Sequence, residues 1–137
     1  LRYELYEGRL RSLDRLDDLT LTHGGVTPVP ALSGDEPAEE FALRFRGFVS
    51  IEEAGVFEFE LVSDDGSRLW LADTLVIDHD GLHSARGKRG MVALAAGIHP
   101  IRVEYFQAGG GQALELRLRR SEEEEWRGVD GTVYYGR

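Results

Sequence analysis

The chain has 137 residues, with 25 acidic and 16 basic side chains and a net charge of -9. Its length predicts a single domain over residues 1–137, large enough to bury a core without cross-links. The acidic excess disfavours nucleic acid and anionic membrane surfaces as partners, because both are bound by basic patches. No apolar run approaches the roughly 20 residues that cross a bilayer, so we expect no membrane insertion. With no cysteine, the sequence offers neither a disulfide nor a thiolate zinc site.

The N-terminal part of the sequence predicts strands and almost no helix. Residues 1–8 alternate apolar and polar side chains, and residues 9–21 leave a short helical turn open without showing a cap signal. Several glycines and prolines predict a loop over residues 23–40. Residues 41–46 and 56–61 alternate again, which is typical of half-buried strands. The side chains expected to face the core are Phe41, Leu43, Phe45, Phe57, Phe59 and Leu61.

The C-terminal part continues this pattern. Residues 68–72 and 74–77 predict two strands, and a charged, glycine-containing loop follows from 78 to 90. Further strands are expected at 91–94, 101–106, 114–119 and 132–135. Short strands separated by glycine turns predict an all-β fold, an antiparallel β-sandwich or a β-barrel with long glycine-rich loops.

Two adjacent carboxylates mark the centre of the chain. Asp64 and Asp65 end one alternating run, and Gly66 precedes the next. Neighbouring side chains of a regular strand point to opposite faces, so both carboxylates can bind one ion only where the backbone leaves strand geometry. We expect Gly66 to permit that bend because glycine tolerates positive φ. Two hard oxygen donors favour calcium over a transition metal. An exposed Asp-Asp-Gly turn that binds nothing is the alternative.

Several stretches at compatible spacings resemble one known family. The resemblance is to the PA-fourteen family, named after the amino-terminal part of anthrax protective antigen, and it covers nearly the whole chain. The stretches are LRYELYEG, FALRFRGFVSIEEAGVFEFELVSDDG, SDDGSRLWLAD, VIDHDGLH and GMVALAAGIHPIRVEYFQAGGGQALEL.

The resemblance implies a β-sandwich module of the kind found within glycosidases, adhesins, toxins and other surface proteins. It therefore implies an extracellular or cell-surface location. For the sugar-binding branch it also implies that the paired aspartates form a cis peptide and chelate calcium, which binds sugar hydroxyls. No targeting segment is visible in the sequence, and the start at Leu1 is what we expect of a module excised from a larger protein.

Two aspartates cannot complete a calcium shell, which takes about 6–8 oxygen ligands. In lectin-like relatives the remaining protein ligands come from the loop after the long strand, which corresponds here to residues 107–112. The candidate ligands in this loop are the amide oxygen of Gln107 and the backbone carbonyls of Gly109 and Gly111. A flexible hairpin that binds nothing is the alternative. Some fungal adhesins complete the shell with asparagine, a residue absent from this sequence. Asp80 is a spare candidate for the ion shell, and we add Gln112 as a ligand-binding candidate.

Other motifs are weaker. His79 and His83 could bind zinc if they shared a helix face, but Gly81 between them disfavours a helix. The sequence has no Gly-x-Ser-x-Gly element and no phosphate loop, and nothing fixes a carboxylate pair for glycosidase chemistry, so we expect no enzyme. Trp70 and Trp126 could stack on sugar rings. Burial under the 78–90 loop is the favoured interpretation for Trp70, and exposure for Trp126.

The sequence thus predicts a calcium-dependent carbohydrate-binding accessory module of a larger secreted or surface protein. Its expected partners are a glycan or glycoprotein and the neighbouring domains of its parent chain. The rival hypothesis is a non-binding structural module that positions a neighbouring domain.

Overall fold

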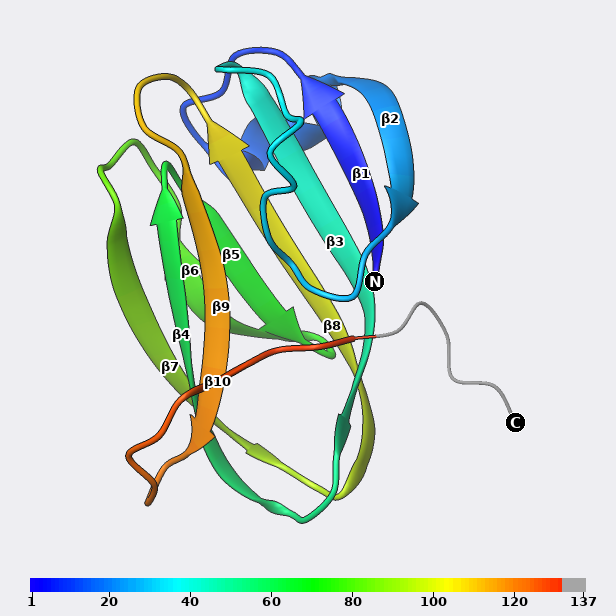
Figure 1. Cartoon of the computed structure of the whole chain (residues 1–137), viewed down its shortest axis with the longest axis vertical. Helices are drawn as coiled ribbons and strands as arrows, with labels where there is room; N and C mark the ends of the chain where they lie inside the picture. The colour runs from blue at the N-terminus through cyan, green and yellow to red at the C-terminus, as the bar shows by residue number, and fades with distance from the viewer. Residues whose placement is uncertain (132–137) are drawn as a thin grey trace.

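The computed structural model describes residues 1–131, which form two packed antiparallel sheets (Figure 1). The larger sheet has the order β2-β1-β3-β8-β5-β6, and the smaller one has the order β10-β9-β4-β7. Within residues 1–131 the two sheets stay separate, so the fold is a sandwich and not a closed barrel. The predicted strand at 132–135 lies outside the described residues. The elements are β1 (Arg2–Glu7), the 3-10 helix η1 (Leu13–Asp18), β2 (Thr20–Val26), β3 (Phe41–Ile51), β4 (Gly55–Asp64), β5 (Ser67–Leu71), β6 (Thr74–His79), β7 (Arg86–Leu94), β8 (Gly97–Gln107), β9 (Ala113–Arg120) and β10 (Arg127–Gly128).

The core lies between the two sheets and follows the predicted alternation. All six predicted side chains of β3 and β4 are at most 2% exposed. The other strands complete the cluster with Leu69, Ile77, Ile101, Val103, Tyr105, Leu114, Leu116 and Leu118. Each fully buried side chain of this size contributes roughly 1.5–3 kcal/mol, so burial of alternate residues accounts for the stability of both sheets.

Three of the connections between the sheets lie at one common end of the sandwich. β4 belongs to the smaller sheet and β5 to the larger one, and the connections β6–β7 and β8–β9 also change sheets at this end (Figure 1). Three crossing segments therefore meet there, namely residues 65–66, 80–85 and 108–112. This topology brings together loops that are more than 40 positions apart in the sequence.

Two strands extend into stretches that the sequence predicts as loops. β2 lies partly within the expected 23–40 loop, and β7 begins at Arg86, inside the expected 78–90 loop. β2 is an exposed edge strand, so its backbone pairing with β1 needs no apolar alternation. Its Gly25 lies against the ring of Tyr3, where a Cβ would come within 2.8 Å of the ring. The first part of β7 is similarly exposed, and it pairs with β4 through residues 86–90.

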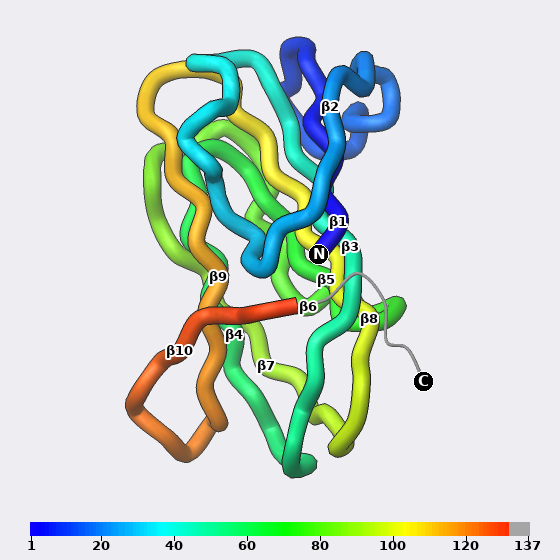
Figure 2. The backbone as a smooth tube through the Cα atoms, turned by 45° about the vertical axis from the view of Figure 1, so that its right-hand side comes forward, coloured from blue at the N-terminus to red at the C-terminus, as the bar shows by residue number. Residues whose placement is uncertain are grey.

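The long connection between β2 and β3, residues 27–40, runs along one side of the sandwich and can be followed in Figure 2. Its Leu32 packs against the main core. The side-chain amide of Gln112 donates to the backbone carbonyls of Pro37 and Ala38 at 2.8 and 2.7 Å. These contacts tie the connection to the 108–112 loop.

A second, smaller apolar cluster lies on the outer face of the larger sheet. There η1 and the residues around it cover part of the sheet, and Ser12 caps η1 by accepting a hydrogen bond from the Asp14 N–H at 3.1 Å. The short helical turn left open by the sequence is therefore present, with Ser12 as its cap. The buried side chains of this second apolar cluster are Tyr6, Leu10, Leu13, Leu16, Ala42 and Phe106. Within the part of the chain that the structure describes, no helix is long and apolar enough to span a bilayer.

Candidate functional site

The acidic turn lies where the chain crosses from β4 to β5. The peptide bond between Asp64 and Asp65 is cis. Gly66 is not among the residues with positive φ, so the prediction that it permits the bend through its φ angle is wrong. Glycine is needed at this position because the backbone of Gly81 and the ring of Phe106 pack directly against it. A Cβ there would lie 2.7 Å from the backbone nitrogen of Gly81 and 2.5 Å from the Phe106 ring.

Asp65 is buried between the other two crossing segments. It is 7% exposed, and its two oxygens accept hydrogen bonds from the N–H groups of Ala108 at 2.8 Å and His83 at 3.3 Å. Among the described residues, neither Asp65 nor Asp64 forms an ion pair with a basic side chain. Two backbone donors thus orient a carboxylate whose charge has no cationic partner.

Asp64 shares this environment. Burial raises the pKa of its carboxyl group, and the neighbouring charge of Asp65 raises it further. Its backbone carbonyl accepts a hydrogen bond from the Tyr105 hydroxyl at 2.5 Å. A Cβ at Gly111 would lie 3.3 Å from Asp64 Oδ2, so the backbone of the 108–112 loop passes directly beside this carboxylate.

Gln107 is completely buried at the end of β8. Its Nε2 donates to the Gly110 carbonyl at 3.1 Å, whereas its Oε1 has no hydrogen-bond donor. Buried acceptors without a partner are rare in folded proteins, and each calls for an explanation. The residues on either side of Gln107, Phe106 and Ala108, both bond to Asp65 through their backbones.

The remaining candidate residues have other contacts. Gly109 lies beside Glu39, since a Cβ there would be 3.2 Å from Glu39 Oε2. The carboxylate of Asp80 accepts from Ser12 Oγ at 2.6 Å, the Leu13 N–H at 2.9 Å and Arg68 at 3.2 Å. Gln112 binds the 27–40 connection, as described above. The structure therefore places Gln107 and Gly111 with the aspartates, and it directs Asp80 towards η1.

His79, at the end of β6, and His83, in the 80–85 crossing, contact each other and nearby backbone carbonyls. The rings of His79 and His83 stack with centroids 4.1 Å apart. The ring nitrogens of His83 lie 2.9 Å from the carbonyls of His79 and Ser84. Within residues 1–131, no group of three or more histidine, aspartate or glutamate side chains is arranged to hold a metal. A metal at Asp64 and Asp65 would therefore need amide or backbone oxygens as its other protein ligands.

Sequence reasoning missed three groups that shape this site. They are the Tyr105 hydroxyl and the backbone N–H groups of Ala108 and His83. Tyr105 lies in the predicted strand 101–106 and was given no role at the site, and its position two residues before Gln107 is the signal that places its hydroxyl near the loop. The two backbone donors carry no signal in the sequence.

The sequence profile of the PA14 domain matches residues 32–127, from the middle of the β2–β3 connection to the start of β10. The chain belongs to the PA14 domain family. Among curated proteins, no sequence matches this PA14 domain.

Solved structures share the fold at low sequence identity. The PA14 sugar-binding domain from an RTX adhesin has 17% identity and a TM-score of 0.79, covering 96% of this chain and 97% of the adhesin domain. The A domain of epithelial adhesin 9 from Candida glabrata, in complex with Galb1-3GlcNAc, has 10% identity and a TM-score of 0.73, with coverages of 93% and 84%. An anti-sigma factor domain-containing protein has 22% identity and a TM-score of 0.80 over 96% of this chain. This PA14 domain spans 46% of the length of that last protein.

Proposed function

We propose that this PA14 domain binds carbohydrate through a calcium ion held at Asp64 and Asp65. One observation carries the proposal. Two adjacent carboxylates, one of them 7% exposed, lack a cationic partner among the described residues. Buried charges in proteins are normally paired or bound to metals, because an isolated buried charge costs several kcal/mol or more. A cation at this position would remove the cost.

The donor set fits a hard cation. The carboxylates of Asp64 and Asp65 would hold the ion, together with the unpartnered Gln107 Oε1 and backbone carbonyls of Gly109 and Gly111. All of these donors are oxygens, which calcium prefers over the nitrogen and sulfur donors typical of zinc. Bound calcium would supply open coordination positions for vicinal sugar hydroxyls. The Ala108 and His83 N–H groups would keep Asp65 oriented, and Tyr105 would fix the backbone of Asp64.

The relatives support a sugar as the ligand. One structure of this fold is described as a sugar-binding domain from an adhesin, and another was solved with Galb1-3GlcNAc. We further propose that the domain is a non-enzymatic accessory module of a longer secreted or cell-surface protein. Its partners would be glycans or glycoproteins and the neighbouring domains of that protein.

The rival function is a non-binding structural module that positions a neighbouring domain. It is favoured by the lack, within residues 1–131, of a third acidic or histidine side chain at the aspartate pair. The two proposals differ in whether the protein responds to calcium, and one experiment separates them.

The test is thermal unfolding with calcium and with a chelator, on the wild type, Asp64→Asn and Asp18→Asn. A ligand that binds only the folded state at about 100 times its Kd adds about 2.7 kcal/mol to the unfolding free energy. We expect calcium to raise the Tm of the wild type and of Asp18→Asn, which removes an exposed charge from η1, but not of Asp64→Asn. Equal Tm values with calcium and chelator in the wild type would favour the structural module. A glycan array probed under the same two conditions then tests the sugar step.

A further inference from the structure

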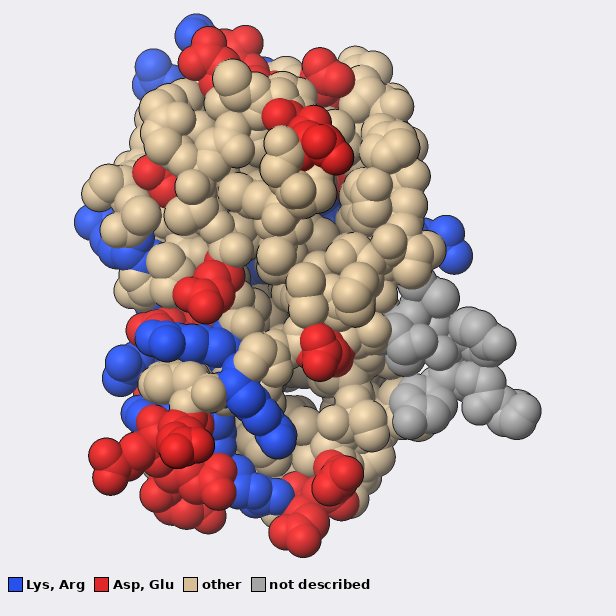
Figure 3. Space-filling view, in the orientation of Figure 1, with Lys and Arg blue, Asp and Glu red and all other residues tan. Residues whose placement is uncertain are grey.

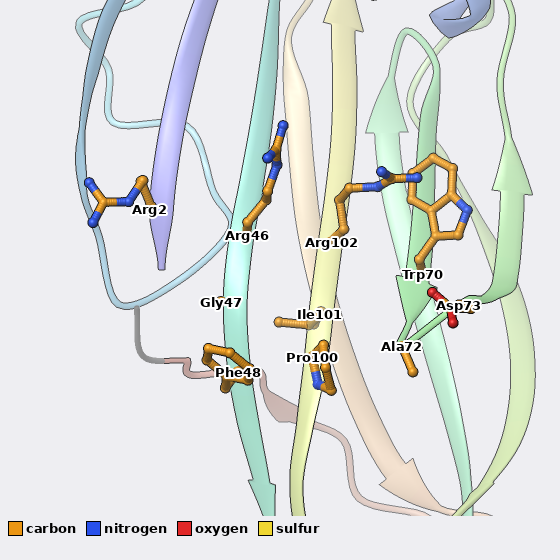
Figure 4. Close-up of a pocket in the computed structure, with 10 residues that line it drawn as sticks. All are labelled: Arg2, Arg46, Gly47, Phe48, Trp70, Ala72, Asp73, Pro100, Ile101 and Arg102. Atoms are coloured by element: carbon orange, nitrogen blue, oxygen red, sulfur yellow. The ribbon is translucent and has the colours of Figure 1, made fainter. Parts of the chain in front are cut away.

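The outer face of the larger sheet is covered over only part of its area. Residues 9–19 cover the part near η1 through the second apolar cluster. The uncovered part forms a cleft of about 520 Å³, shown in Figure 4. Its lining includes Arg2, Arg46, Phe48, Trp70, Pro100 and Arg102. This cleft is far along β5 and β8 from the aspartate turn, and nothing proposed above uses it.

The basic residues of the cleft form one row across neighbouring strands. In the sheet register, Arg2 is opposite Arg46, Arg46 is opposite Arg102, and Arg102 is opposite Trp70. Figure 4 shows these four side chains at one level on β1, β3, β8 and β5. Since neighbouring strands lie about 4.7–4.9 Å apart, the backbones of the three arginines follow one another at this interval, while Figure 4 shows the side chain of Arg2 directed away from Arg46 and that of Arg102 turned over Trp70.

The positive charge of this row is only partly neutralised, by long ion pairs. Like charges directly opposite one another on a sheet are destabilising. The nearest acidic oxygens lie 3.6 Å from Arg46, on Glu4, and 3.8 Å from Arg102, on Glu104. Both acids already accept closer hydrogen bonds, from the Tyr6 hydroxyl at 2.8 Å and from Arg44 Nε at 2.7 Å. Asp73 is the one acidic residue among the described residues that line the cleft.

Trp70 orients one of the three arginines. The guanidinium of Arg102 lies over the indole ring, 3.9 Å from its centroid. Stacking of this kind leaves the N–H donors at the edge of the guanidinium plane free for other partners. The Nε of Arg102 is buried and has no hydrogen-bond partner. Trp70 thus packs against Arg102 on the surface of the sheet. The prediction that it is buried under the 78–90 loop is wrong.

We propose that this cleft binds a linear ligand with at least two oxyanion groups, such as carboxylates, sulfates or phosphates. One group is bound between Arg46 and Arg102, and the next is bound by Arg2, whose exposed side chain turns towards the ligand. Guanidinium groups form bidentate, charge-assisted hydrogen bonds with such groups. Phe48 and Pro100 provide an apolar flank for the uncharged part of the ligand. The protein as a whole carries a net charge of -9, so diffuse attraction of anions is disfavoured and binding must come from this local row.

The test is calorimetric titration in the presence of a chelator, which keeps it independent of the calcium proposal. The probes are tripolyphosphate, the tricarboxylate tricarballylate and inorganic sulfate. We expect one or both of the multivalent anions to bind, at least tenfold more tightly than sulfate, and the tighter of the two identifies the chemical group preferred. Asp64→Asn, which tests the calcium site, should leave this binding unchanged.

Matched variants assign the binding to the row. Arg46→Gln should weaken the tighter multivalent probe at least tenfold, and Arg15→Gln, which removes an even more exposed charge from η1, should change it less than twofold. Arg2→Gln serves as a second row variant if Arg46→Gln does not fold. In a Trp126→Phe background, the Trp70 fluorescence should change on binding. Equal weakening by the row and control variants, sulfate binding as tight as that of the multivalent anions, or no binding of either multivalent anion would overturn the proposal.

Discussion

At the scale of single residues, buried charges on the outer faces of the two sheets are held by arginines. Arg44 lies between two acids, with its Nε 2.7 Å from Glu104 and its terminal nitrogen 2.8 Å from Asp17. The side chains of Arg44 and Glu104 are 10% and 7% exposed.

On the smaller sheet, Glu60 accepts hydrogen bonds from Arg117 at 2.7 Å and from Arg89 at 3.1 Å. Figure 3 shows the basic side chains gathered over this sheet, where Arg89, Arg117 and Arg119 also surround the ring of Trp126. Trp126, expected to be exposed, is therefore half-buried.

Replacing Arg44 should destabilise the fold strongly. Arg44→Met leaves Glu104 buried without its main partner, and breaking a buried pair in this way typically costs about 3–5 kcal/mol. The double variant Arg44→Met/Glu104→Met removes the unpaired charge and should recover much of this loss. Urea unfolding of both variants measures the difference. A single variant as stable as the double one would show that Glu104 does not depend on Arg44.

Glu60 should make stability depend on acid pH. Burial on its own would raise the pKa of this carboxyl group, but the hydrogen bonds from Arg117 and Arg89 outweigh burial and hold the pKa below its usual value. A lowered folded-state pKa stabilises the protein above the unfolded pKa of about 4.3, and this contribution is lost as the pH falls through the lower folded value. Unfolding free energies measured by urea titration from neutral to acid pH should therefore fall less steeply in Glu60→Gln than in the wild type. Parallel curves would contradict this assignment.

At the scale of elements, alternation in the sequence predicted the strands that bury one face and missed those that do not. β3, β4, β8 and β9 have clear alternating patterns because their inner side chains form the core. β2 and the first half of β7 are exposed, so only backbone pairing defines them. The residue composition of both segments is typical of a loop, and the sequence therefore predicted loops there. The candidate site was predicted in the same uneven way. Asp64, Asp65 and Gln107 could be named as candidates because their side chains carry oxygen donors. The contribution of Ala108 and His83 comes from backbone N–H groups, whose positions depend on the fold and not on the residue type.

The turn between β4 and β5 should be sensitive to any added side chain. At Gly66 a Cβ would overlap the backbone of Gly81 and the Phe106 ring. Overpacking of this kind costs roughly 1–3 kcal/mol, so we expect Gly66→Ala to lower the unfolding free energy by about that amount. Gly128→Ala is the matched control, because a Cβ at Gly128 meets nothing within 4 Å. Chemical denaturation of the two variants compares them directly, and equal stabilities would mean that the turn can relax around the methyl group.

At the scale of the whole molecule, the aspartate pair lies where three segments cross between the sheets. Under the proposed function, a cation there would join the 65–66, 80–85 and 108–112 crossings without touching the core. We therefore expect calcium to slow hydrogen exchange at the amides of Ala108 and His83, and at the central residues of β3 and β8 in step with the higher unfolding free energy, but to leave the exposed edge strand β2, which opens locally, unchanged. Exchange measured by NMR with calcium and with chelator tests this. Equal slowing at β2 and at Ala108 and His83, or no slowing at Ala108 and His83, would contradict this placement of the cation.

The packing of Phe106 links the aspartate turn to the far side of the larger sheet. Its backbone pairs with Asp65 and Gly66, while its ring belongs to the apolar cluster under η1. Asp80 joins the same two regions through Ser12 and Leu13. If the domain were subjected to random mutagenesis and selected for tighter or weaker glycan capture, beneficial substitutions should accumulate at Leu10, Leu13 and Leu16 as well as in the loops. Affinity could then be tuned from a buried cluster that no sugar reaches.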